Sequence, residues 1–303
     1  MTVDGDIATV ETVAWKPRRG ARHLVPSFSL LGGACYSFRF EVSGLVEGQW
    51  TPWVVTTTIG SPVFPQGPSS GGPLAVEVDM FRAGAPVESV RLRVRVHPAG
   101  ALVHPMLVTL SACDLDRCSE PESRSAGTDP LRVPARSQME EPAAIRERIC
   151  SPTSLAMVLE YWGQRAPVTG LAAEIFHPEL DRYGVWPAAI AAAARRGVAG
   201  YLLRFPDWSS AAWCLEQGLP VIASIRYEVD ELAGAPIPRT DGHLVVLTGE
   251  DMTHVHVNDP AGRTAGEVPR RYRREEVCRV WLERAGVGYV FFPLAPNAPT
   301  GGK

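Results

Sequence analysis

Strict alternation of apolar and polar residues marks the first third of the chain as strand-forming. Residues 90–96 read Val-Arg-Leu-Arg-Val-Arg-Val. Because successive side chains of a strand point to opposite faces, this segment places apolar residues on one face and arginines on the other. Residues 74–80 alternate as well, residues 37–42 do so less regularly, and residues 102–110 form an apolar run with Pro105 near its start. These patterns predict short strands.

Clusters of glycine, proline and serine separate the strand-like runs, at residues 60–62, 65–73 and 83–86. Such clusters are typical of turns. Short strands divided by turns at this spacing favour two packed antiparallel sheets. We therefore expect residues 1–118 to form an all-β sandwich N-terminal domain.

The composition shifts to Ser, Glu, Pro, Arg and Gly over residues 119–128. This mixture is typical of linkers, so we interpret residues 119–130 as a linker between two domains. The length of 303 residues also favours two hydrophobic cores over one. Residues 131–303 then make up the second domain.

Helical periodicity begins directly after the linker. Four apolar residues recur on one helix face: Leu155, Val158, Leu159 and Trp162. Pro152 suits the first turn and Gly163 the end, which predicts a helix over residues 151–162. Further helices are expected over residues 187–196 and 209–217, and strands over residues 131–135, 220–228, 244–249, 254–258 and 288–292. This order predicts an α+β domain.

Composition and charge exclude several classes of protein. The hydrophobic fraction is 45%, the charged fraction is 21%, and the net charge is −3. These values are ordinary for globular proteins and give no electrostatic reason to expect nucleic acid or an anionic membrane as a partner. No apolar run is long enough to span a bilayer. Residues 1–11 lack the apolar stretch of a secretory signal, so we expect a cytoplasmic location, with export by another route or a different translation start left open.

The six cysteines are scattered, at positions 35, 113, 118, 150, 214 and 278. This spacing does not predict a disulfide scaffold. Cys113 and Cys118 could form a local disulfide or half of a metal site, but no second pair follows at zinc-type spacing, so free thiols are expected. His254 and His256 alternate on one strand without a third ligand. We therefore expect no metal or other cofactor.

Cys150 stands immediately before the first predicted helix. A helix N-terminus carries about half a positive charge and free N–H groups, which favour a thiolate over a thiol. The same N–H groups could hold the oxyanion of a tetrahedral intermediate. The alternative is a small buried apolar residue.

His243 precedes one apolar strand, and Asp259 follows the next strand along the chain. If these strands are antiparallel and joined by a turn near Asp251, the two side chains can pair. A carboxylate on one ring nitrogen fixes the tautomer and leaves the other nitrogen for a thiol. Ordinary turn residues are the alternative for both positions.

The chain around Cys150 resembles the nucleophile helix of C39-like peptidases, a branch of the papain-like cysteine peptidase fold. The resemblance is carried by RICSPTSLAMVLEYWG at residues 148–163, YGVW at 183–186, GLPVIAS at 218–224, GHLVVLTG at 242–249 and VNDPAG at 257–262. It implies a papain-like domain with thiol-dependent cleavage of peptide bonds. Cys150, His243 and Asp259 match the positions of the catalytic residues.

Two positions depart from the family pattern. Ser151 follows the nucleophile where the family often has glycine, and a serine can cap a helix. Papain-like enzymes usually place an oxyanion-hole glutamine a few residues before the cysteine, whereas Gln138 lies twelve residues upstream. The resemblance implies Gln138 for this role only if a longer loop delivers it. Trp186 is expected to line the substrate cleft or to act as a packing anchor.

Three functions stay open at this point. The first is a hydrolase that cleaves peptide or amide bonds through a Cys150 acyl-enzyme, with a peptide or protein as substrate. The second is an acyltransferase or transglutaminase-like enzyme that uses the same thioester, and the third is a catalytically silent binding protein. In the β domain, Trp50 and Trp53 flank Pro52 and either stack on a glycan or cell-wall ligand or belong to the core.

Overall fold

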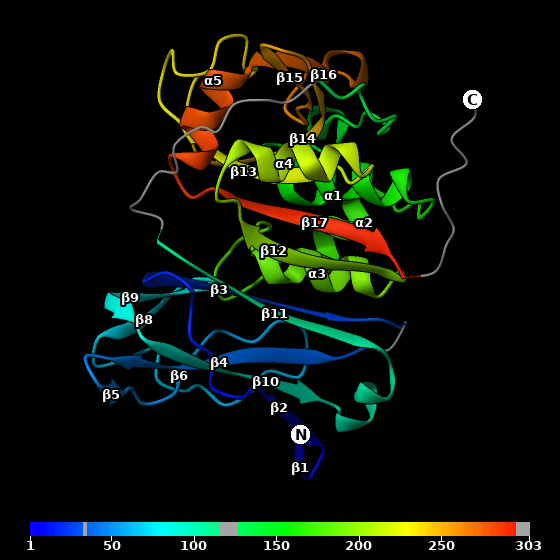
Figure 1. Cartoon of the computed structure of the whole chain (residues 1–303). Coiled ribbons are helices and arrows are strands. Elements are labelled where there is room, and N and C mark those ends of the chain that lie inside the picture. Colours follow the sequence, from blue (N-terminus) through cyan, green and yellow to red (C-terminus); the bar gives the residue numbers. More distant parts are fainter. Residues whose placement is uncertain (33–34, 115–126, 295–303) are drawn as a thin grey trace.

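The computed structural model describes residues 1–32, 35–114 and 127–294, which form two stacked parts (Figure 1). The N-terminal part consists of antiparallel sheets. The C-terminal part combines one antiparallel sheet with helices. Most of the predicted linker, together with Cys118, lies outside the described residues, and the domain limits at residues 118 and 131 stay predictions.

Two antiparallel sheets build the N-terminal part. The first runs in the order β1 (Thr2–Asp4), β2 (Ile7–Glu11), β10 (Ser89–His97), β4 (Ser37–Val46), β5 (Gln49–Trp50), with β6 (Val54–Val55) paired to β4. The second runs in the order β11 (Met106–Cys113), β3 (Ala21–Leu30), β9 (Met80–Val87), β8 (Leu74–Glu77), β7 (Ser70–Gly71). Burial alternates along β10 as its sequence predicts, with the valines and leucine buried and the arginines partly exposed.

Two expected strands in this part have the wrong limits. The chain reverses inside residues 74–80, because Glu77 pairs with Met80 across a two-residue turn. The sequence hides this turn because Val78 occupies a position of φ 59°, where glycine or asparagine is usual. Residues 102–110 divide into a 3₁₀ turn, η1 (Ala99–Val103), and β11, with Pro105 between them.

The C-terminal sheet runs in the order β12 (Val198–Arg204), β17 (Val287–Pro293), β13 (Val221–Tyr227), β14 (Thr240–Glu250), β15 (His254–Asn258), β16 (Pro269–Arg273). Its helices are α1 (Cys150–Tyr161), α2 (Val168–Ile175), α3 (Trp186–Ala194), α4 (Trp208–Glu216) and α5 (Arg274–Val277), which continues into the π-helical turn η5 (Cys278–Leu282). Short 3₁₀ turns are η2 (Gln138–Glu140), η3 (Arg146–Arg148) and η4 (Ala265–Glu267). No helix of the described residues is long and apolar enough to cross a membrane.

The helices cover opposite faces of this sheet (Figure 1). Leu244 and Val246 of β14 pack in the apolar cluster that contains α1, α2 and α3, whereas Val245 and Leu247 pack in the cluster that contains α4. The three predicted helices are confirmed to within two residues, and the late strands are confirmed as well. The prediction missed α2, β12, β16 and α5. The strand expected over residues 131–135 is wrong, since this segment is not part of the sheet, although Leu131 N donates to Thr248 O of β14 at 2.7 Å.

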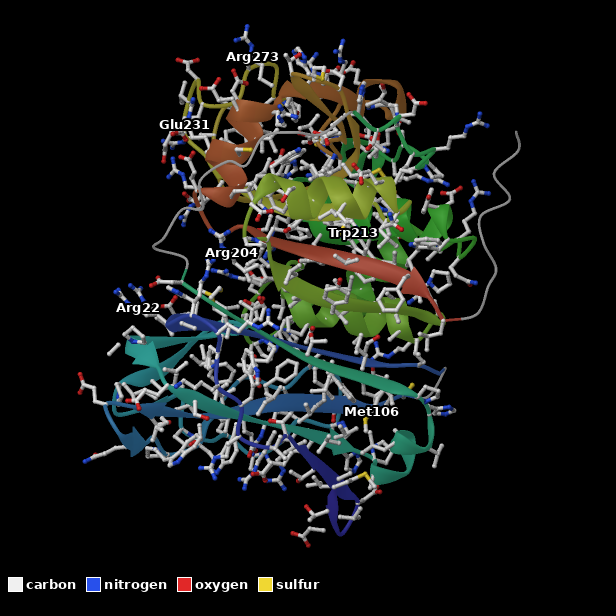
Figure 2. The ribbon with its side chains drawn as sticks, viewed as in Figure 1. Arg22, Met106, Arg204, Trp213, Glu231 and Arg273 are labelled. Atoms are coloured by element: carbon white, nitrogen blue, oxygen red, sulfur yellow. The ribbon has the colours of Figure 1, made fainter. Side chains whose placement is uncertain are left out.

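A row of serines joins the two parts. β12 is an edge strand, so the N–H groups on its outer side have no strand partner. Serine hydroxyls of β3 and β11 accept them: Gly200 N donates to Ser29 Oγ at 3.3 Å, Leu202 N to Ser27 Oγ at 3.1 Å and Arg204 N to Ser111 Oγ at 3.0 Å. Figure 2 shows Arg204 at this junction. One apolar cluster also contains residues of both parts, so apolar packing continues across the junction.

We predict that Ser27→Ala destabilises the protein. The substitution leaves the buried Leu202 N–H without an acceptor, which costs about 1–3 kcal/mol. The free energy of unfolding in urea measures the loss. Ser70→Ala, at an exposed position of β7, is the control and should change nothing measurable. Equal stability of both variants would contradict the serine row.

Candidate active site

Cys150 is the first residue of α1 and is partly exposed. The residue before it, Ile149, offers no side chain to cap the helix, so the first N–H groups remain available. Burial opposes ionisation of the thiol. A hydrogen bond and the charge of His243, with the N–H groups of Leu244 and Ser151, outweigh it and lower the pKa of Cys150. A thiolate is therefore favoured at this helix start.

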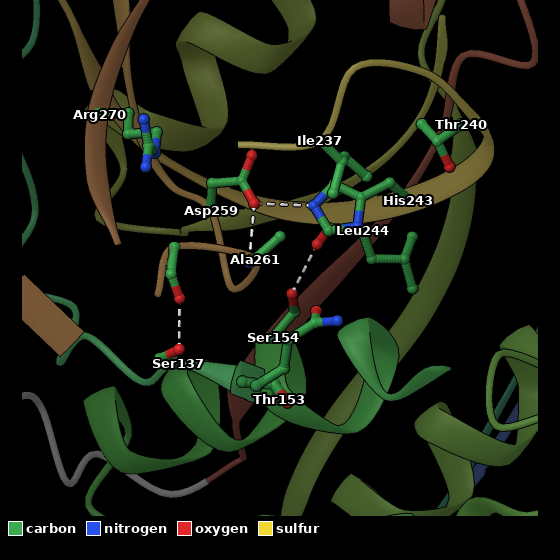
Figure 3. A network of polar contacts seen from close by, with 12 residues as sticks. Ser137, Thr153, Ser154, Ile237, Thr240, His243, Leu244, Asp259, Ala261 and Arg270 are labelled. Atoms are coloured by element: carbon green, nitrogen blue, oxygen red, sulfur yellow. Dashed lines mark hydrogen bonds and ion pairs between the residues drawn. The ribbon is translucent and has the colours of Figure 1, made fainter. Parts of the chain in front are cut away.

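His243 lies near the start of β14 and is held against α1. The hydroxyl of Ser154 in α1 donates to the carbonyl oxygen of Leu244 at 3.0 Å (Figure 3). This bond fastens the first turns of α1 to the strand residue that follows His243. The structure thereby brings Cys150 and His243 close enough for each to shift the pKa of the other.

Asp259 completes a buried pair with His243. The distance from His243 Nε2 to Asp259 Oδ1 is 2.8 Å, and the two side chains are 3% and 0% exposed (Figure 3). Burial disfavours both charges, but the carboxylate raises the pKa of His243 and the imidazolium lowers the pKa of Asp259. Since Nε2 is engaged by Asp259, Nδ1 is the ring nitrogen left for the thiol.

Sequence reasoning missed Tyr272, which supports the carboxylate from β16. Its hydroxyl donates to Asp259 Oδ2 at 2.7 Å, while Ala261 N donates to Oδ1 at 3.0 Å. Tyr272 is 2% exposed, and burial beside Asp259 raises its pKa. The signal available in the sequence was a single aromatic residue within the arginine-rich run of residues 270–274.

Gln138 reaches the same region through a longer loop. Its backbone N–H donates to Pro260 O at 2.8 Å, and the hydroxyl of Ser137 donates to Gly262 O. η2 is thus tied to the loop that follows Asp259. The side-chain Nε2 donates to Arg146 O at 2.7 Å, and the buried Oε1 has no hydrogen-bond partner among the described residues. The oxyanion role of Gln138 stays a prediction.

Trp186 begins α3 and is partly exposed, and its role in substrate binding also stays a prediction.

His254 and His256 flank Asp251, whose carboxylate pairs with Arg271. Within the described ranges, no three His, Cys, Asp or Glu side chains are placed to hold a metal ion.

The remaining described cysteines differ from Cys150 in their ionisation. Burial raises the pKa of Cys113 to about 12, and of Cys214 and Cys278 to about 11. Cys35 is exposed. All five described cysteines carry free thiols. A thiol reagent can therefore separate Cys150 from the buried thiols.

The chain belongs to the Peptidase_C39 like family, whose model matches residues 130–289. The resemblance noted from the sequence is thus confirmed, and it assigns the C39-like peptidase fold to the C-terminal part.

Two solved structures are similar to this chain. A protein from Bacillus anthracis described as a C39-like peptidase is 19% identical over 55% of this chain and 98% of its own, with a TM-score of 0.43. The peptidase domain of Streptococcus ComA, a bifunctional ABC transporter of a quorum-sensing pathway, is 14% identical over 54% of this chain and 99% of its own, with a TM-score of 0.38. A search of curated proteins found no match.

We predict that Cys150 is alkylated fast at pH values where an ordinary thiol is protonated. Its thiolate persists as pH falls from the usual thiol pKa of about 8.5 down to its own lowered pKa. His243→Ala removes the counter-charge, so the pKa of Cys150 should rise and the alkylation rate at pH 7 should fall on the order of tenfold.

The measurement is iodoacetamide labelling against pH, read by mass spectrometry in a Cys35→Ser, Cys118→Ser background. Cys214 serves as the internal control for a buried thiol. Identical profiles with and without His243 would contradict the pairing.

We predict that Tyr272→Phe destabilises the protein by about 1.5–3 kcal/mol, because Asp259 Oδ2 then lacks its donor in a buried position. Tyr227→Phe is the matched control, since its hydroxyl donates to the carbonyl oxygen of Ile237 rather than to a carboxylate. Chemical denaturation compares the two. A loss in Tyr227→Phe equal to or above that in Tyr272→Phe would count against the prediction.

Proposed function

We propose that this protein is a thiol-dependent hydrolase that cleaves peptide or amide bonds through an acyl-enzyme on Cys150. One observation carries the proposal. A partly exposed cysteine at a helix start has its pKa lowered by a neighbouring histidine, and a fully buried carboxylate orients that histidine. Membership of the Peptidase_C39 like family supports the same reaction class.

In the proposed reaction, the Cys150 thiolate attacks the carbonyl carbon and a C–S bond forms. The C–N bond then breaks, and the His243 imidazolium gives its proton to the leaving amine. Water next attacks the thioester, His243 takes the proton, and the C–S bond breaks to release the acid and restore the thiolate. Asp259 keeps the ring oriented and stabilises its charge throughout.

The developing oxyanion needs donors close to Cys150. We propose the first N–H groups of α1 and the side-chain amide of Gln138 for this role. The backbone bond from Gln138 to Pro260 supports the second choice, because it fixes η2 beside the loop of Asp259. Trp186 is proposed as a substrate-binding residue.

The N-terminal sheets are proposed to form a β-sandwich domain that presents or selects the peptide or protein substrate. The Arg91 guanidinium lies 4.1 Å from the ring centroid of Trp50, and that of Arg93 lies 3.7 Å from the centroid of Trp53. These arginines occupy ring faces on which a sugar would stack. The observed contacts therefore support packing of the two rings more than a glycan or cell-wall ligand.

The test is cleavage of a diverse peptide library, read by mass spectrometry. Wild-type protein should cleave a subset of peptides, and Cys150→Ala should lower the rate by about 10³-fold or more, because the nucleophile is lost. Cys35→Ser, at an exposed thiol, is the control and should retain the activity. Cleavage that survives Cys150→Ala would overturn the proposal. Conjugation to added amines in place of hydrolysis would assign acyl transfer instead.

A further inference from the structure

The turn between β8 and β9 of the N-terminal sheets contacts the start of α3 in the C-terminal part. Asp79 lies at this turn and is 7% exposed. Its Oδ2 accepts a hydrogen bond at 2.7 Å from the backbone N–H of Trp186, the first residue of α3. α3 has no side-chain cap of its own, since Val185 precedes it. A carboxylate from the other half of the chain therefore serves as its cap.

The turn that carries Asp79 is strained. Val78 has a φ of 59°, in the left-handed region that β-branched residues rarely adopt. Strain of this kind persists only where surrounding contacts demand it, and it is concentrated at functional sites. The hydrogen bond between Asp79 and the first residue of α3 is a contact that can maintain the strained backbone of this turn.

A buried tyrosine lies between Asp79 and the nucleophile helix. Tyr289 of β17 has no exposed surface, and burial, Asp79 and Cys150 together raise its pKa. Both acidic groups are thus near its ring hydroxyl. The Ser151 side chain faces this hydroxyl, yet neither oxygen makes a hydrogen bond of normal geometry within the described part of the chain. The serine that departs from the family pattern therefore belongs to a buried polar group behind Cys150.

The connection from α2 to α3, residues 176–185, is fastened to the N-terminal part at both ends. Asp79 holds its far end through Trp186, and His177 Nε2 lies 3.0 Å from the carbonyl oxygen of Thr58 at its near end. Arg148, two residues before Cys150, pairs with Asp181 of this connection at 2.9 Å. The connection thus borders the approach to the nucleophile.

We propose that Asp79 is a positioning residue. It fixes the position of the 176–185 connection and of the start of α3, which border the substrate-binding region beside Cys150. The N-terminal sheets thereby shape the binding of an extended peptide. This inference rests on the proposed function and deepens it, because it names a residue that sets how the substrate is held.

The negative charge of Asp79 is not what the contact with α3 requires. Burial raises its pKa to about 7, against the N–H of Trp186, its own N–H and the charge of Arg182. Because this pKa lies above the ordinary value, burial costs the charged form more than these contacts return, and stability falls as pH rises from that ordinary value through about 7. What the site uses is an acceptor at a fixed position, which asparagine also supplies.

The test compares two reagents on Cys150 in the Cys35→Ser, Cys118→Ser background. The rate with iodoacetamide measures the reactivity of the thiol alone. The rate with a set of tripeptidyl chloromethyl ketones also depends on binding of their peptide part beside Cys150. Asp79→Ala should lower the rate with the tripeptidyl reagents about tenfold and leave the iodoacetamide rate within about twofold. Asp79→Asn should keep both rates near those of the unchanged background.

His177→Ala provides a second variant, since it removes the other fastening of the same connection. It should show the same selective loss, which keeps the test decisive if Asp79→Ala does not fold. Equal losses with both reagents, no loss with either, or equal effects of Asp79→Asn and Asp79→Ala would overturn the positioning role.

The outcomes separate this inference from the proposed function. If the wild-type protein cleaves no peptide but the tripeptidyl labelling depends on Asp79, hydrolysis fails and the positioning role stands. If peptides are cleaved and labelling ignores Asp79, the positioning role alone fails. Tripeptidyl reagents that react with Cys150 no faster than with free cysteine would overturn both.

Discussion

A carboxylate without exposed surface, Asp259, sets the strongest demand on the C-terminal part. A buried charge is tolerated only when it is paired and hydrogen-bonded. Oδ1 has His243 and Ala261 N as donors, and Oδ2 has Tyr272. These donors come from β14, the loop after β15, and β16, so the register of three strands must agree before the charge can be buried.

The N-terminal sheets satisfy a second demand of the same sheet. As an edge strand, β12 would expose a row of N–H groups that could pair with a strand of another chain. The serines of β3 and β11 accept hydrogen bonds from these groups and so prevent such pairing. The two parts are therefore joined by directional bonds as well as by apolar packing. A junction of this kind keeps its geometry, which is the condition for one part to position residues of the other.

The elements predicted from sequence were those with strong local signals, such as α1 with its apolar stripe and β10 with its alternation. β12 was missed because Gly200 interrupts its pattern and its partners lie far away in sequence. The proximity of His243 and Asp259 could be inferred from two adjacent strands and a turn. Tyr272 could not, since its contact depends on the pairing of β15 with β16. The contact between Asp79 and Trp186 spans 107 residues and leaves no local signal.

Comparison of the cysteines shows what distinguishes Cys150. Burial acts on Cys113, Cys214 and Cys278 as well, and there it raises the pKa and leaves an inert thiol. At Cys150 the same penalty is outweighed by the imidazolium of His243 and by backbone N–H groups. Two contacts place the donors that come from β14: Ser154 fastens β14 to α1, and Asp259 holds the ring of His243. The ionisation of this thiol is therefore a property of the assembled fold, because no donor near Cys150 in sequence would supply the charge of His243.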